Sequence, residues 1–187
     1  MQYAYIHPYM YYRKLNDYVI NKFQIGYDKD TNCITFPVRD IKGRLLGVTE
    51  RSVSSKFFYI PENIDKPVYL LNDVIKDGYT STIICESQID ALTCWSYGYV
   101  ACALLGTGGS KQYEILNKSG IRNYILMFDG DGPGRNGATK FLKNIRKDVL
   151  VENVVLPEGK DINDLNLYEF ESLLESHGVK NLLRIKS

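Results

Sequence analysis

The sequence lacks the features that would mark a zinc protein, a disulfide-stabilised protein or a membrane protein. Its four cysteines include no CxxC pair, and its two histidines, His7 and His177, lie near opposite ends. Zinc sites and disulfide frameworks need cysteines or histidines at suitable spacing, so we expect neither here. No apolar run has the length of a membrane span, and the N-terminus is polar and aromatic, unlike a signal peptide. We therefore expect a cytoplasmic protein with no membrane partner.

The sequence also has little net charge, no internal repeat and no low-complexity linker. Its net charge is +1 over 187 residues, with 24% charged and 44% hydrophobic residues. Such a balance is ordinary for a globular chain and excludes a uniformly basic nucleic-acid binder. The length allows one compact domain or two small lobes that share an interface.

Basic residues are concentrated in one part of the first half. The segment between residues 39 and 56 has five basic residues and only two acidic ones, whereas acidic residues gather farther on in glycine-rich turns. A basic segment beside an acidic site suggests phosphate binding with metal-assisted chemistry. Any one of these charges could equally be solvated surface. The basic residues are Arg39, Lys42, Arg44, Arg51 and Lys56.

The first 78 residues predict a small α+β lobe. Residues 11–25 have apolar positions at helical spacing, and Gly26 could end a helix there. Residues 33–39 and 44–51 alternate as strands do, and the turn between them contains Lys42-Gly43. This pattern favours an antiparallel hairpin.

Residues 79–187 predict an α/β domain. Four apolar runs alternate with helical stretches, which indicates a mostly parallel sheet covered by helices on both faces. The runs are 82–85, 99–105, 123–128 and 149–156; the helical stretches are 88–97, 111–118, 136–147 and one from about residue 167.

Acidic or glycine-rich segments follow each apolar run. In parallel sheets, functional residues lie just beyond the carboxyl ends of the strands. Carboxylates gathered there would repel one another, and Mg²⁺ or Mn²⁺ ions would relieve that repulsion. Two such ions could activate an attacking hydroxyl and stabilise a leaving phosphate oxygen. The segments are Glu86 with Asp90, then 106–109, then Asp129 with Asp131, then Asp161.

Each of these segments alone has an ordinary explanation. The Asp-Gly-Asp-Gly run could be a surface turn, and Glu86-x-x-x-Asp90 could be a solvated helix face. An EF-hand is excluded because Lys140 stands at its twelfth position, and a P-loop is excluded because 106–111 lacks the Gly-Lys-Ser/Thr ending. Their order at successive strand exits favours a joint site.

The ordered set resembles the TOPRIM domain shared by DnaG primases, topoisomerases, OLD-type nucleases and RNase M5-like enzymes. The matching segments are CESQIDAL (85–92), LLGTG (104–108) and FDGDGPG (128–134). Segments 26–28, 34–51 and 56–62 resemble the polymerase lobe that precedes TOPRIM in DnaG primases. KDINDL (160–165) resembles the downstream acidic motif of primases, especially the phage primase–helicase type.

The resemblance implies a DNA primase catalytic core that makes short RNA primers from NTPs on single-stranded DNA. It implies that Asp129 and Asp131 hold Mg²⁺ or Mn²⁺, and that Asp90 and Asp161 support the metal site. It leaves open whether Glu86 is a metal ligand or an acid–base group.

The resemblance also implies binding residues and partners. Nucleotide or template contacts would come from Arg39, Arg51, Lys56, Gly106, Thr107 and Gly108. Asn163 stands where cellular primases often have the second acid of an Asp-Pro-Asp motif. The resemblance therefore implies a role for Asp164 less directly than for Asp161. A replicative helicase and a zinc-binding primase domain would act in trans or be missing from this chain.

Three other functions fit the sequence less well. A TOPRIM nuclease of the RNase M5-like or OLD-like type lacks the FPVRD lobe. A topoisomerase needs a tyrosine nucleophile from another large domain. A degenerate module that only binds single strands or nucleotides would not need the principal acids, which are all present.

Overall fold

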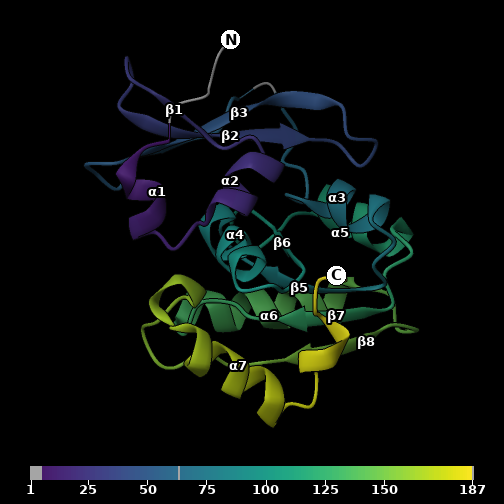
Figure 1. Ribbon diagram of the computed structural model, residues 1–187. Coiled ribbons are helices and arrows are strands. Elements are labelled where there is room, and N and C mark those ends of the chain that lie inside the picture. The colour runs from purple at the N-terminus through teal and green to yellow at the C-terminus, as the bar shows by residue number, and fades with distance from the viewer. Residues whose placement is uncertain (1–5, 63, 187) are drawn as a thin grey trace.

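The computed structural model describes residues 6–62 and 64–186, and within these ranges the strands form two sheets (Figure 1). The first sheet is antiparallel, with strand order β1-β2-β3-β4. The second is parallel, with order β6-β5-β7-β8. The strands are β1 (Gly26–Asp28), β2 (Cys33–Arg39), β3 (Leu45–Ser52), β4 (Phe58–Tyr59), β5 (Ser81–Cys85), β6 (Ala101–Ala103), β7 (Asn123–Leu126) and β8 (Leu150–Asn153).

The parallel sheet is flanked by helices, as the alternating pattern predicts. Its central strand β5 is buried along its whole length, because helices cover both faces of such a sheet. None of the helices in the described residues is long and apolar enough to cross a membrane. The helices are α3 (Leu71–Lys76), α4 (Gln88–Ser96), α5 (Ser110–Lys118), α6 (Gly132–Asn144) and α7 (Leu167–Ser176), with short 3₁₀ helices η1 (Ile162–Asp164) and η2 (Lys180–Leu182).

The N-terminal helix differs from its prediction. The single helix expected over 11–25 is wrong, because the structure has α1 (Pro8–Tyr12) and α2 (Asp17–Lys22). Lys14 has a φ of 62°, a left-handed conformation that a helix cannot continue through. The Asn16 side chain then accepts a hydrogen bond from the Val19 amide at 3.0 Å and starts α2 as its N-cap.

The antiparallel lobe, defined here as α1, α2 and β1 to β4, packs on the parallel-sheet domain along α4. Phe23 at the end of α2 meets Trp95 of α4 edge to face, with ring centroids 5.1 Å apart. Asn16 also donates a hydrogen bond to the Ser96 carbonyl at 3.1 Å. One continuous cluster of buried apolar residues runs from α1 and β2 through β5 to α7. The boundary near residue 78 stays a prediction about how the chain divides into domains.

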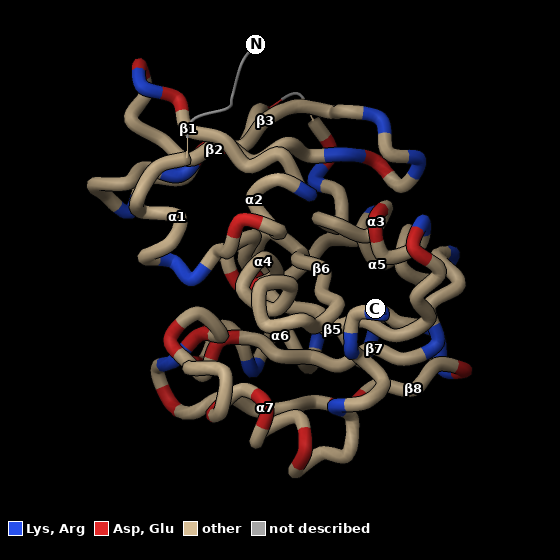
Figure 2. Tube along the Cα trace, in the orientation of Figure 1, with Lys and Arg blue, Asp and Glu red and all other residues tan. Residues whose placement is uncertain are grey.

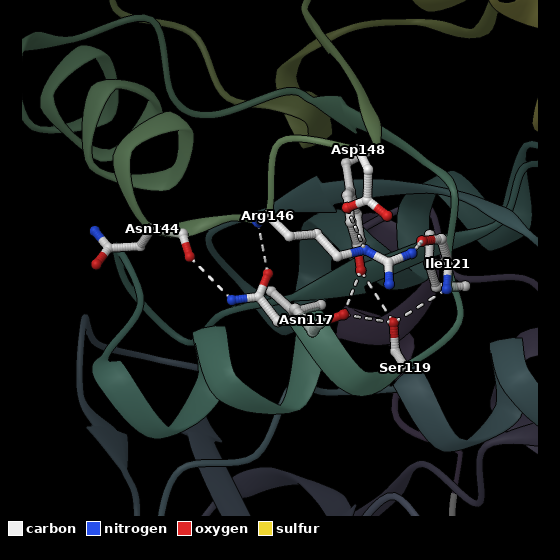
Figure 3. Close-up of polar contacts among 8 residues, drawn as sticks. Asn117, Ser119, Ile121, Asn144, Arg146 and Asp148 are labelled. Atoms are coloured by element: carbon white, nitrogen blue, oxygen red, sulfur yellow. Dashed lines mark hydrogen bonds and ion pairs between the residues drawn. The ribbon is translucent and has the colours of Figure 1, made fainter.

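The helices α5 and α6 are joined to each other and to the sheet. The ring of Phe141 lies between Tyr113 and Tyr124, at centroid distances of 5.8 and 5.5 Å. Beyond the end of α6, the Arg146 amide donates to the Asn117 side chain, which in turn donates to the Asn144 carbonyl (Figure 3). These contacts fix the direction in which the chain leaves α6 for β8.

Gly130 joins the loop after β7 to the segment after β8. Its amide donates to the Lys160 carbonyl, and its carbonyl accepts from the Gly159 amide, both at 2.8 Å. A Cβ atom at this position would lie 2.0 Å from the Pro157 carbonyl oxygen. Only glycine therefore allows the two loops to come this close.

Gly130→Ala is expected to lower the free energy of unfolding by about 2–3 kcal/mol, because backbone would have to move to make room. Gly132→Ala is the matched control, since nothing lies within 4 Å of the added Cβ there. Its effect should stay within about 0.5 kcal/mol. Urea denaturation followed by circular dichroism measures both. Equal losses for the two variants would contradict the close approach at Gly130.

Candidate active site

Glu86 and Asp129 lie next to each other at the exits of neighbouring strands. Glu86 directly follows β5 and Asp129 follows β7, and the two strands pair in parallel. The Glu86 Oε1 atom accepts a hydrogen bond from the Asp129 amide at 3.2 Å. The Gly106 amide donates to the Glu86 carbonyl at 3.0 Å. Three of the expected segments therefore meet at one edge of the sheet.

Asp131 and Asp161 each begin a helical turn. Asp131 is the N-cap of α6, and its Oδ1 accepts from the Gly134 amide at 2.7 Å. This helix begins at Gly132, earlier than the predicted 136, because the glycine-rich run itself forms the first turn. Asp161 caps η1 by accepting from the Asp164 amide at 2.8 Å, and Asp164 caps the Asp161 amide in return.

Asp90 is buried behind this edge, with 2% of its surface exposed. One carboxylate oxygen accepts from the Ser87 hydroxyl, and the other accepts from the Asn163 amide at 3.2 Å. A buried carboxylate needs such partners because it has lost its water. Asp90 is thus placed to act on the site through charge and hydrogen bonds.

Three of the acids, Asp129, Asp90 and Glu86, have a raised pKa. Burial, followed by the charges of Asp90, Glu86, Asp161 and Asp131, raises the pKa of Asp129 to about 7. Burial and the charge of Asp161 raise the pKa of Asp90 to about 7 as well. Burial also raises the pKa of Glu86, and the charge of Asp131 adds to the shift although the Asp129 amide opposes it. The five acids form a coupled negative cluster.

This donor set suits a hard divalent cation. The ion pairs found among the described residues include none of the five acids, although the charge of Arg13 acts on Asp90. Across 6–62 and 64–186, no three Asp, Glu, His or Cys side chains are close enough to hold one ion. Glu86 and Asp131 each accept a backbone hydrogen bond through one oxygen and have a second carboxylate oxygen for an ion. Oxygen ligands of this kind are those that Mg²⁺ and Mn²⁺ prefer.

A cavity of about 370 Å³, here called the cleft, joins the acids to the antiparallel lobe. Arg51 and Lys66 line it together with Glu86 and Asp129. Lys66 was missed in the sequence, because a lone lysine in an irregular segment gives no pattern. The remaining lining residues are Phe36, Phe58, Ile60, Ser87, Gln88, Ile89, Leu105 and Gly106.

A second cavity of about 440 Å³ adjoins the cleft. Residues 104–112 line it with Lys66, so it contains Gly106, Thr107 and Gly108. Gly106 and Gly108 have φ values of 118° and 83°, which suit glycine. The loop 106–109 therefore lines this second cavity, and its first residue, Gly106, also lines the cleft.

The structure does not bring the other two predicted basic residues into the cleft. Arg39 donates to the Gln24 side chain at 2.7 Å and to the Gly43 carbonyl, and it lines a separate small pocket. Lys56 is exposed between β3 and β4. Their contacts with nucleotide or template stay predictions. In Figure 2, basic segments lie along the antiparallel lobe, whereas acidic segments gather beside the α6 label.

In the metal-free protein, Asp129→Asn is expected to flatten the dependence of stability on pH. The pKa of Asp129 is about 7 in the folded state against 3.8 for an ordinary aspartate. The folded state therefore keeps a proton that the unfolded state releases, so this group destabilises the fold as pH rises from about 4 to 7. Thermal melts between pH 4 and 8 measure the effect.

A bound divalent ion should reverse that loss in the unmodified chain. At a hundredfold excess over its dissociation constant, Mn²⁺ adds about 2.7 kcal/mol of stability. The gain should be absent in Asp129→Asn. It should be present in the control Asp148→Asn, because the Asp148 carboxyl is 72% exposed and pairs with Arg146. Equal gains in all three proteins would contradict the metal site.

Three comparisons relate this geometry to known proteins. A family model described as Toprim-like matches residues 83–166. The DNA primase of Buchnera aphidicola is 30% identical over 149 residues, which are 72% of this chain and 26% of that protein. An uncharacterized protein of Mycoplasma genitalium is 30% identical over 158 residues, which are 76% of this chain and 70% of that protein.

The fold has a match among solved structures. The structure titled as the DnaG primase catalytic domain bound to ssDNA has a TM-score of 0.75 and 22% identity, covering 90% of this chain and 70% of that one. The likeness shows that both chains share one fold. This chain spans about a quarter of the length of the Buchnera primase. Segments, fold and relatives agree, and the chain belongs to the DnaG-type primase family.

Proposed function

We propose that this chain is the catalytic core of a DNA primase, which joins ribonucleotides into short RNA primers on single-stranded DNA. The observation that carries the proposal is the shared cleft, in which Arg51 and Lys66 lie with Glu86 and Asp129. A cleft that contains both cations and metal-binding acids has the groups that a nucleoside triphosphate needs. The relatives named DNA primase and the neighbour solved with ssDNA support the substrates.

The acids have separate tasks in this proposal. Asp129 and Asp131 would hold the divalent ions, with Glu86 as a further ligand or as the group that accepts a proton. Such ions activate an attacking hydroxyl and stabilise the charge that develops on the phosphate. Asp90 and Asp161 add negative charge behind the ligands, as their effect on the pKa of Asp129 indicates. The hydrogen bond from the Asp129 amide orients Glu86.

The basic residues and the glycine loop would bind the substrate. Arg51 and Lys66 would offset the charge of the triphosphate within the cleft. The backbone amides of Thr107 and Gly108 would approach phosphate oxygens in the second cavity. Gly106 lines both cavities, and its own amide holds the loop to the Glu86 carbonyl. We also propose that a zinc-binding primase domain and a replicative helicase help the core to select its template.

Asp131→Asn should abolish primer extension, with a loss of at least ~100-fold, because it removes one metal-binding charge and keeps the side chain's shape. The assay supplies a primed single-stranded DNA, labelled NTPs and Mg²⁺ or Mn²⁺, and resolves products by length. Asp148→Asn serves as the control and should extend like the unmodified chain. Shortening of the labelled strand in place of extension would identify a nuclease and overturn the proposal.

Arg51→Ala should weaken binding of ATP with Mg²⁺ by roughly 10-fold or more, since hydrogen bonds to charged groups contribute about 1.5–3 kcal/mol. Arg44→Ala is the matched control on the same hairpin, where Arg44 pairs with Asp40 outside the cleft. Calorimetric titration of both variants measures the difference. Equal affinities for the two variants would remove Arg51 from the nucleotide site.

A further inference from the structure

Asn163 turns its side chain away from the acids and toward the antiparallel lobe. It lies within η1, next to Ile162, and 9% of its surface is exposed. Its Oδ1 accepts from the Arg13 Nε at 2.7 Å, and its Nδ2 donates to the Arg13 carbonyl at 2.8 Å and to Thr93 Oγ1 at 2.9 Å. Both polar atoms of the Asn163 side chain, Oδ1 and Nδ2, therefore have hydrogen-bond partners.

The backbone of Asn163 contacts both parts of the molecule. Its amide donates to Asp90 Oδ1 at 3.2 Å, which ties it to the acid behind the site. Its carbonyl accepts from the Lys14 ammonium group, which also donates to the Leu165 carbonyl at 2.9 Å. Figure 2 shows the basic turn after α1 descending toward the parallel-sheet domain. One residue thus joins the acid cluster to that turn.

The hydrogen bonds continue from Arg13 to the cleft. Arg13 Nη1 donates to the Tyr9 hydroxyl at 3.2 Å, and Arg51 Nε approaches the same hydroxyl at 3.5 Å. Arg51 then reaches the cleft beside Glu86 and Asp129. The hydroxyl of Tyr9 is therefore the point at which two guanidinium groups from distant segments meet.

We infer that Asn163 is a positioning residue. Through Arg13 and Tyr9 it holds Arg51 at a fixed position relative to the acid cluster. This inference rests on the proposed function, because it assigns Arg51 the task of binding the nucleotide. In a core made of two parts, the distance between the phosphate-binding cation and the metal-binding acids must be fixed. The chain Asn163–Arg13–Tyr9–Arg51, called the relay below, fixes that distance across the junction.

The amide suits this task better than a carboxylate. A carboxylate could accept from Arg13 Nε, but it could not donate to the Arg13 carbonyl and to Thr93. It would also add a negative charge beside Asp90 and Asp161, which already interact unfavourably. Where primases often have the second acid of this motif, this chain has Asn163, whose hydrogen bonds connect the antiparallel lobe to the parallel-sheet domain.

Two substitutions break the relay at separate points. Asn163→Ala releases Arg13, and Tyr9→Phe removes the hydroxyl that Arg13 and Arg51 share. Each should raise the KM for ATP in primer extension about 5- to 10-fold, with kcat changed less than about 3-fold and the Mg²⁺ concentration for half activation unchanged. Because both act through Arg51, the double variant should show no further rise in KM.

Tyr97→Phe is the matched control. It removes the hydrogen bond of 2.8 Å from the Tyr97 hydroxyl to the Leu165 carbonyl, on the same segment but outside the relay. It should lower the melting temperature without raising KM. If Tyr97→Phe raises KM as Asn163→Ala does, or if the effects of Asn163→Ala and Tyr9→Phe on KM add, Asn163 only stabilises the fold and the inference is wrong.

If Asn163→Ala does not fold, an unchanged KM in Tyr9→Phe also overturns the inference. Failure of the unmodified chain to bind ATP or extend a primer would instead overturn the proposed function.

Discussion

Repulsion among carboxylates at one edge of the parallel sheet is the constraint on which the rest of the structure depends. Glu86, Asp129 and Asp131 lie near the buried Asp90 and near Asp161, and none of the five has an ion-pair partner among the described residues. Burial, followed by the charges of neighbouring acids, raises the pKa of both Asp90 and Asp129. A fold keeps such an arrangement only where something offsets its cost, and a divalent ion does so directly.

Backbone contacts hold the repelling groups in place. Gly130 docks the loop after β7 onto the segment before Asp161, and the amides of Asp129 and Gly134 hold the carboxylates of Glu86 and Asp131. None of these contacts requires a basic side chain. Arg51 on β3 and Lys66 on the segment before α3 line the same cleft as Glu86 and Asp129, where they can meet a substrate.

The sequence predicted the parallel sheet and the meeting of Glu86 and Asp129 at its edge, because both have strong local patterns. A buried apolar strand followed by an acid is visible in 82–86 and in 123–129, and the strand-exit rule then brings Glu86 and Asp129 together. The break of the first helix at Lys14 was not visible, since a left-handed residue with a long side chain leaves no pattern. Lys66 and the relay were missed because they depend on contacts between segments up to 150 residues apart.

The central claim is that Asp129 and Asp131, with Glu86, hold a divalent cation that faces a nucleotide in the cleft, while Asp90 and Asp161 add negative charge behind them. Crystals grown with Mn²⁺ and ATP test it most directly, because anomalous scattering locates the metal independently of the protein. We predict Mn²⁺ bound directly by carboxylate oxygens of Asp129 and Asp131 or Glu86, with the triphosphate between the metal and Arg51 and Lys66. Mn²⁺ bound only outside this sheet edge, or a triphosphate bound away from Arg51 and Lys66, would contradict it.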